Sequence, residues 1–462
     1  MTYQSYVLPA EGRRRRVPRW IIGVAVATAV ASVVAFVTTL MWPTGQEQVR
    51  GEPLAFQTFR FITDIEYDHP SATYLTAIDP KQDVGYVAWE QASQLRIRAF
   101  HLASGERQWQ VALDSPSWSR LIAVPGLLLV VGEGQSVSDP RRLLALRSVD
   151  GQSAWERTVR GDDALVFGEQ FLAWLSRAEP ALLGLNPATG EEMWRQNLAS
   201  ADARLGGVLT EAVLDSPTDW SGEALAVTYD HRLVLVTSEA VVRVLDGRDG
   251  RVLSERAGVV TPSELILAYR DRLYVARDEA GYEVVSYQLN ELTAPPVIHY
   301  RSTDPKRWPD SLVACGPGRL CLVDTYMFDS ASREVVVVAP DGGGEVWRQA
   351  VPYAEVLLPV GDWLAVISDD LAGHTLTVWN GQGELVLARN AVATRLNYGN
   401  LLIIEGPLYD PEKVRVAGLA TAVGEPVNLG RAPLSIGPDC AWNEKYLLCA
   451  GRDAAEVWQF AE

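Results

Sequence analysis

The stretch Leu182-Leu183-Gly184-Leu185-Asn186-Pro187-Ala188-Thr189-Gly190-Glu191-Glu192-Met193-Trp194 combines a short apolar strand, a glycine turn and a second strand that carries a tryptophan. The same spacing of glycine and tryptophan recurs along the chain, at Gly105 with Trp109, Gly151 with Trp155, Gly190 with Trp194, and Gly343 with Trp347. Three further turns keep the glycine without the tryptophan, at Gly250, Gly383 and Gly424. A unit that recurs in this way predicts an array of structural repeats.

Nine nearly continuous apolar runs open the successive units, at residues 86–89, 127–131, 171–174, 233–236, 273–276, 320–323, 364–367, 401–404 and 447–450. Such strands are typical of sheets that are buried on both faces. The glycine suits a left-handed turn position, and the tryptophan would pack against a neighbouring blade. We therefore expect an all-β domain that forms a single closed β-propeller of eight or nine four-stranded blades.

The two ends of this domain bear on how the ring closes. The chain ends at Glu462, after only the inner strands of the last unit, so we expect residues 55–63 to supply the outer strand of that blade. The widest gap between two apolar runs lies between Phe171 and Leu233. It holds an insertion around Ser216-Pro217-Thr218-Asp219-Trp220.

The Ala188-Thr189-Gly190-Glu191-x-x-Trp194 unit resembles the repeat of pyrroloquinoline-quinone-like β-propellers. This family contains quinoprotein dehydrogenases and the outer-membrane assembly lipoprotein of Gram-negative bacteria, and its members usually have eight blades. The resemblance covers most of residues 54–462 and is specific for the fold rather than the function. The dehydrogenases place two adjacent cysteines against the cofactor, with a catalytic aspartate and a Ca²⁺ ion. This chain has no adjacent cysteines, so the resemblance implies a non-enzymatic branch without a cofactor.

The N-terminal region predicts a membrane anchor. Five arginines precede residue 20, and the segment from Ile21 to Met41 carries no charge and would span about 31 Å as a helix. The positive-inside rule places the arginines in the cytoplasm. We expect a basic cytoplasmic tail (1–19), a transmembrane signal-anchor helix (20–42), a flexible tether (43–53) and an extracytoplasmic propeller (54–462), which together make a single-pass protein of the cell membrane.

Two alternatives concern this span. Ala29-Val30-Ala31 resembles a signal-peptidase site, so cleavage is the alternative to an uncleaved anchor. Small residues recur every four positions along one helix face, at Gly23, Ala27, Ala31 and Ala35. Small residues at this spacing permit close approach of two membrane helices, which is the basis for a helix–helix dimer hypothesis.

Candidate catalytic, cofactor-binding and metal-binding residues do not emerge from the sequence. The five histidines are scattered without metal-binding spacing, at His69, His101, His231, His299 and His374. The loop Asp246-Gly247-Arg248-Asp249-Gly250 has the pattern of a hairpin turn rather than of a calcium loop. The formal net charge of −17 argues against nucleic acid and anionic lipid as partners of the propeller.

The four cysteines predict two local disulfides. Cys315 and Cys321 bracket a Gly-Pro-Gly turn, and Cys440 and Cys449 bracket a second turn at the same place in another unit. Each pair closes a short hairpin, and disulfides fit the oxidising compartment that the predicted topology implies. A shared zinc site is the rival interpretation, which the spacings do not favour.

Two hypotheses about function remain. The favoured one is a membrane-anchored extracytoplasmic propeller that acts as a binding or scaffold module for an unidentified envelope protein, peptide or glycan. The alternative is a cofactor-dependent, quinoprotein-like enzyme whose active site the sequence does not reveal.

Overall fold

The computed structural model describes residues 52–67, 74–79, 82–114, 117–219, 230–261, 264–278, 281–302, 304–316, 318–341, 344–370, 373–406, 414–431, 440–451 and 453–462. The predicted tail, membrane span, cleavage site and small-residue face all lie outside these residues and stay predictions. In the part of the chain that the structure describes, no helix is long and apolar enough to cross a bilayer.

In the ranges that the structure describes, nine four-stranded antiparallel sheets form the propeller. The sequence predicts eight or nine blades, and the structure has nine. The first five blades are β2 (Tyr74–Asp79), β3 (Val84–Gln91), β4 (Gln94–His101) and β5 (Arg107–Asp114); β6 (Trp118–Val124), β7 (Leu127–Gly132), β8 (Pro140–Arg147) and β9 (Ser153–Arg160); β10 (Ala164–Phe167), β11 (Leu172–Ser176), β12 (Ala181–Leu185) and β13 (Glu192–Asn197); β14 (Arg204–Gly207), β15 (Arg232–Val236), β16 (Val241–Asp246) and β17 (Val252–Ala257); and β18 (Leu265–Tyr269), β19 (Arg272–Asp278), β20 (Tyr282–Gln288) and β21 (Val297–Arg301).

The remaining four blades follow the same order. They are β22 (Arg307–Ala314), β23 (Leu320–Tyr326), β24 (Asp329–Val338) and β25 (Glu345–Ala350); β26 (Ala354–Val360), β27 (Trp363–Asp370), β28 (Gly373–Trp379) and β29 (Leu385–Arg389); β30 (Ala391–Asn397), β31 (Asn400–Glu405), β32 (Arg415–Ala420) and β33 (Pro426–Arg431); and β34 (Cys440–Trp442), β35 (Tyr446–Ala450) and β36 (Ala454–Ala461) with β1 (Phe56–Glu66). The nine predicted apolar runs correspond to the second strand of each blade.

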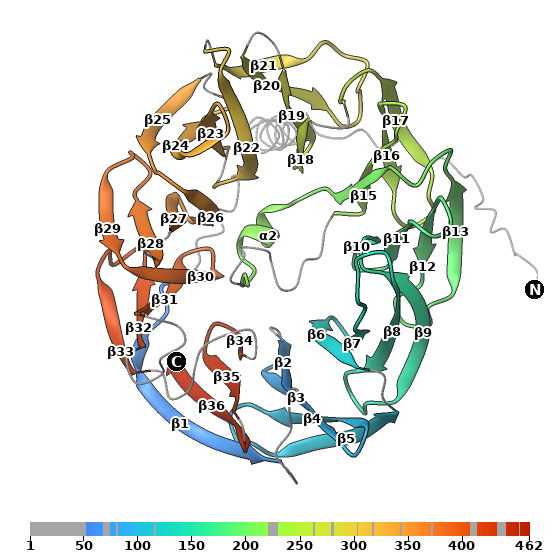
Figure 1. Cartoon of the computed structure of the whole chain (residues 1–462), viewed down its shortest axis with the longest axis vertical. Helices are drawn as coiled ribbons and strands as arrows, with labels where there is room; N and C mark the ends of the chain where they lie inside the picture. Colours follow the sequence, from blue (N-terminus) through green and yellow to red (C-terminus); the bar gives the residue numbers. More distant parts are fainter. Residues whose placement is uncertain are drawn as a thin grey trace, which may run out of the picture. The chain divides into compact units, whose positions relative to one another are not determined.

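The strands of each blade run from the channel outward, and we call them A, B, C and D (Figure 1). Because neighbouring strands are antiparallel, the A–B and C–D turns lie on one face of the ring, which we call the AB face. The B–C hairpins and the connections between blades lie on the opposite face, the BC face.

The ring closes through its first strand. β1 pairs antiparallel with β36 and provides the outer strand of blade 9, as the sequence predicts, although it runs beyond residue 63 to Glu66. The two ends of the propeller chain are thus hydrogen-bonded within one sheet, so blade 9 cannot separate from blade 1 without breaking that sheet.

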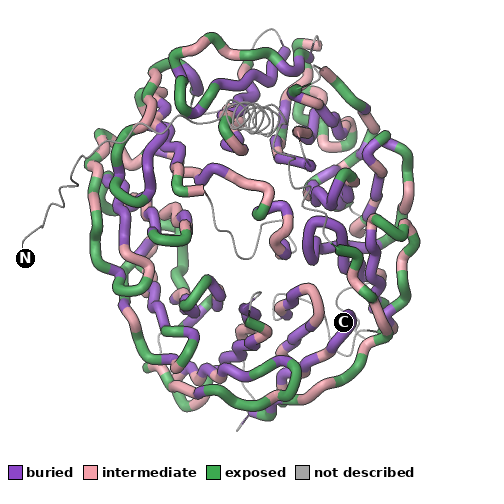
Figure 2. Tube along the Cα trace, turned by 180° about the vertical axis from the view of Figure 1, so that it is seen from behind, coloured by how far each residue is buried: buried purple, intermediate pink, exposed green. Residues whose placement is uncertain are grey.

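Apolar packing extends from each blade to the next. Ile97 and Tyr86 of blade 1 belong to the same buried cluster as Leu128 and Val130 of blade 2. In Figure 2 the exposed positions gather along the outer strands, whereas the middle strands are mostly buried. A single blade therefore has two apolar faces that only its neighbours cover.

The repeated tryptophan contacts the repeated glycine of the following blade. A Cβ atom on Gly190 would lie 2.6 Å from Cγ of Trp155, and Gly190 has a φ of +68°, so only glycine fits at this turn. Trp155 Nε1 donates a hydrogen bond to Pro187 O at 2.7 Å in the same turn. The contact recurs for Trp109 over Gly151, Trp194 over Gly250 and Trp347 over Gly383. Three of these indoles are buried and that of Trp194 is half-buried. Gly343 lies outside the described residues.

In units without the tryptophan, other side chains occupy the corresponding position between neighbouring blades. His299 on β21 is 5% exposed, and its Nδ1 lies 3.0 Å from Pro340 O in the C–D turn of blade 6. A carbonyl only accepts, so Nδ1 carries the proton and Nε2 accepts from Ser286 Oγ at 2.7 Å. At the ring closure, Thr63 of β1 lies against Gly105. His299 is thus a neutral replacement for the indole N–H donor.

We expect Trp155→Ala to lower the free energy of unfolding by about 3–5 kcal/mol, because it leaves a cavity and an unpaired carbonyl between two blades. Gly190→Ala should also destabilise the domain, because its methyl group would overlap the indole. Denaturant unfolding of the propeller measures both changes. A loss below about 1 kcal/mol for Trp155→Ala would show that the junction does not depend on this ring.

We also expect the stability of the propeller to fall as the pH is lowered through about 6.5, the ordinary pKa of histidine. Burial lowers the pKa of His299, so in this range the unfolded chain binds a proton that the folded chain does not. His299→Asn should reduce this slope in denaturant titrations between pH 7.5 and 5, whereas the same change at exposed His101 should preserve it. Equal slopes for the wild type and His299→Asn would contradict the assignment.

Candidate functional site

A segment of the chain enters the channel between the A and B strands of blade 4. Residues 208–219, which we call the crossing segment, follow β14 and include the short helix α2 (Glu211–Leu214). Figure 1 shows α2 inside the ring of A strands. The predicted insertion around residue 216 therefore lies within the channel rather than on the outer surface. Residue 220 of that insertion is outside the described residues.

The first part of the crossing segment is attached to blade 5. Leu209 N donates to Ala268 O, and Leu209 O accepts from Arg270 N, both at 2.9 Å. The carboxylate of Glu211 then accepts from Tyr269 Oη at 2.6 Å and pairs with the Arg270 guanidinium. These contacts fix the direction in which the segment leaves its own blade.

Arg395 attaches the next part to the opposite side of the ring. This residue of β30 is 4% exposed, and its guanidinium donates to the carbonyl oxygens of Val213 at 2.9 Å, Ser216 at 3.0 Å and Pro359 at 3.2 Å. Burial lowers the pKa of Arg395 to about 10, and the nearby carboxylate of Asp215 acts in the opposite direction. The group is therefore cationic at neutral pH and donates to three backbone carbonyls, one of which, Val213 O, also accepts from Ser216 N at 3.2 Å.

Thr218 forms the far end of the attachment. Its backbone N–H donates to Arg395 O at 2.9 Å, and its hydroxyl accepts from Arg395 N at 3.0 Å. Trp442 of β34 donates from Nε1 to Thr218 O at 3.0 Å, and Thr394 lies 3.1 Å from the threonine hydroxyl. Thr218 is fully buried, so the segment that starts in blade 4 is tied to blades 8 and 9.

Two carboxylates lie near each other on the AB face, Asp215 of the crossing segment and Glu444 of blade 9. Asp215 accepts from Tyr398 N at 3.0 Å, and Glu444 accepts from Asn397 Nδ2 at 3.1 Å. Burial raises the pKa of Glu444, and the nearby charges of Asp215 and Asp83 act in the same direction. Within the described residues, no three histidine, cysteine, aspartate or glutamate side chains converge to hold a metal ion.

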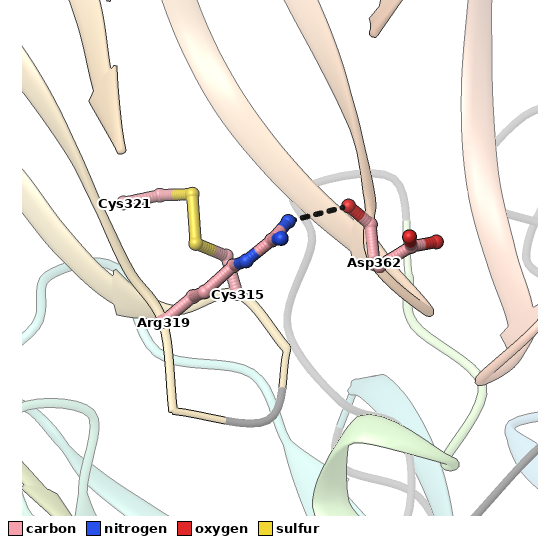
Figure 3. The surroundings of a disulfide bond; sticks show 4 residues. All are labelled: Cys315, Arg319, Cys321 and Asp362. Atoms are coloured by element: carbon pink, nitrogen blue, oxygen red, sulfur yellow. Dashed lines mark hydrogen bonds between the residues drawn. A yellow bond between two sulfur atoms is a disulfide. The ribbon is translucent and has the colours of Figure 1, made fainter. Parts of the chain in front are cut away.

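Both predicted disulfides are present, with the local pairing. Cys315 and Cys321 are joined across the A–B hairpin of blade 6, and Cys440 and Cys449 face each other on β34 and β35 of blade 9. Between the first pair, Arg319 donates to Asp362 O of the next blade at 3.1 Å (Figure 3). Both bonds therefore stabilise A–B hairpins on the face that the crossing segment occupies.

Three surface hollows accompany these features. One of about 620 Å³ lies between blades 2 and 3, beside Trp174, and one of about 450 Å³ adjoins the crossing segment at Thr210 and His231. A third, of about 220 Å³, lies between blades 5 and 6 beside Trp308. Two of the arginines around the first hollow pair with acidic side chains of their own blades, Arg160 with Asp162 and Arg195 with Glu192, and Arg157 donates to Gly190 O at 2.7 Å.

The residues that hold the crossing segment were not predicted. The apolar run 401–404 predicts a strand, but that prediction does not include Arg395 and Thr394 just before it. The available signal was an arginine next to apolar residues just before the run 401–404, because a charged residue in an inner strand needs buried partners. The turn 246–250 is a C–D hairpin, and Asp246 there pairs with Arg248, which lowers the pKa of that carboxyl to about 2.

We expect Arg395→Met to lower the free energy of unfolding by about 2–4 kcal/mol, because three buried carbonyls would lose a charged donor. Amides of residues 208–219 should then exchange faster with solvent. Arg120→Met is the matched control, because Arg120 reaches Asp219 of the same segment only through a half-exposed ion pair at 3.6 Å, and its loss should cost below about 1 kcal/mol. Unchanged exchange in Arg395→Met would show that the segment is held by other contacts.

Comparisons with known proteins identify the family of the chain. The sequence profile described as outer membrane protein assembly factor BamB matches residues 71–173, 93–257 and 178–398. No curated protein matches significantly. Among solved structures, BamB from Moraxella catarrhalis is 13% identical, with a TM-score of 0.42 over 87% of this chain and 98% of that chain. A eukaryotic initiation factor is 11% identical, with a TM-score of 0.49 over 79% and 90%. The profile matches more than half of the length of this chain. The chain therefore belongs to the BamB family of β-propellers.

Proposed function

We propose that this chain is a membrane-anchored, extracytoplasmic scaffold that binds another protein through the BC face of its propeller. The anchor and its orientation rest on the uncharged span after the N-terminal arginines. The two disulfides fit an oxidising compartment. The family takes its name from an assembly factor for other proteins, which supports a protein partner.

The observation that carries the choice of face is the crossing segment. On the AB side, the chain itself occupies the channel and is fixed by Arg395, Thr218 and Trp442. Both disulfides also lie in A–B hairpins. The B–C hairpins on the opposite face carry neither restraint, and loops on a rigid scaffold are common binding elements. The BC face is therefore the one offered to a partner.

The test uses the full-length chain in intact spheroplasts. Added protease should cut the tether at residues 43–53 and release the propeller, while an epitope on the N-terminal tail stays protected. Chemical crosslinking before proteolysis should give a defined protein adduct on the released propeller. A propeller that stays protected, or that yields free thiols on peptide mapping, would overturn the location. Adducts confined to the anchor fragment would overturn the binding role.

A further inference from the structure

The B–C hairpin of blade 6 ends in two bulky apolar residues. Met327 and Phe328 alone connect β23 to β24, and they are 59% and 77% exposed. Both have left-handed backbone conformations, with φ of +48° and +61°. A two-residue hairpin with this geometry favours Asn-Gly, because side chains with a Cβ are strained there. We call these two residues the knob.

Blade 1 provides a direct comparison within the same chain. Its B–C hairpin also has two residues, Ala92 and Ser93, with φ of +49° and +63°. The conformation is therefore the same, but the side chains are small. The apolar bulk of the knob is thus not required by the turn, and it adds exposed apolar surface at a strained position. Strain and exposure together indicate that these side chains serve a contact outside the fold.

The knob lies beside the ring of Trp308 and the hollow between blades 5 and 6. The ring of Phe328 lies 6.0 Å from that of Trp308 on β22, centroid to centroid. Trp308 also lines the hollow between blades 5 and 6, together with Leu265, Tyr282 and Pro309. The hollow measures about 220 Å³, below the range of about 300–1,000 Å³ typical of small-molecule sites. Its size fits a single side chain from a protein partner.

Lys306 adds a charge to this surface. It is exposed, and its Nζ lies 5.7 Å from the ring centroid of Tyr326, directly before the knob. Neighbouring Arg307 pairs with Glu334 at 2.9 Å and faces Asp324, whereas within the described residues no carboxylate lies within ion-pair distance of Lys306. A cation beside an apolar anchor suits a partner that brings a carboxylate.

We propose that Met327, Phe328 and the hollow beside Trp308 form a docking site for an extended protein segment that carries an apolar side chain next to an acidic one. The apolar side chain enters the hollow, the knob packs over the segment, and Lys306 pairs with its carboxylate. A formal net charge of −17 disfavours anionic lipid as the occupant. This inference rests on the proposed scaffold function and gives it a specific site.

The first test is stability. Met327→Asn/Phe328→Gly gives the turn its preferred residues and should raise the thermal unfolding midpoint of the propeller. Ala92→Asn/Ser93→Gly is the matched control in blade 1 and should also raise it. If replacing the knob lowers the midpoint, the knob is a packing element of blade 6 and the proposal is wrong.

The second test is binding, with a displayed library of random dodecapeptides as the probe. Selection on the full-length chain in detergent should enrich peptides with an aromatic or leucine residue beside aspartate or glutamate. A synthetic peptide from that set should bind about tenfold or more weakly to the knob variant and to Lys306→Glu, but equally well to the blade 1 control. Enriched peptides that bind both hairpin variants alike would overturn the site.

Two further outcomes would contradict the proposal that an extended protein segment occupies this site. Knob-dependent binding to phosphatidylcholine vesicles would assign the surface to a membrane, and a knob-dependent dimer in sedimentation would assign it to a second copy of the chain. A knob that is dispensable for the crosslinked adduct in spheroplasts would overturn this site while the scaffold function stands. A propeller protected from protease would instead overturn the scaffold's location.

Discussion

The propeller depends on contacts at the outer edge of its junctions, and at five of them a side chain of one blade covers a glycine turn of the next. Each sheet has two apolar faces and can cover neither by itself, so the array is stable only when every junction is closed. Trp155 over Gly190 shows how specific the contact is, because the indole needs both the absent Cβ and the carbonyl of Pro187. The repeated tryptophan and glycine therefore stabilise the fold only where two neighbouring blades meet.

A ring of nine blades must also satisfy the polar groups in its centre. The crossing segment is largely irregular backbone, and its carbonyls need donors once it is buried. Arg395 and Trp442 supply them from two different blades. A buried guanidinium would be unfavourable alone, but here its desolvation is offset by hydrogen bonds to three backbone carbonyls. The arginine and the segment therefore stabilise each other, and neither is expected to be ordered without the other.

Much of the fold was predictable because its determinants are local in the sequence. The strand at residues 401–404 and the turn at Gly190 are determined by nearby residues and do not depend on contacts with distant parts of the sequence. The closing strand and both disulfides followed from the same units. His299 was not predictable as a replacement for tryptophan, because its role appears only when Pro340 of the next blade is beside it. The path of the crossing segment was hidden for a similar reason, since Thr218 and Arg395 are far apart in sequence.

The two faces of the ring follow different physical rules. On the AB face, the disulfides and the crossing segment remove conformational freedom, and Thr218 and Arg395 are hydrogen-bonded to each other there. On the BC face, the hairpin of blade 6 instead holds apolar side chains in water, in a backbone conformation that disfavours them. A sequence optimised only for its own stability would place small or turn-forming residues there, as blade 1 does with Ala92 and Ser93. The unfavourable choice in blade 6 therefore indicates selection for something other than the stability of the ring.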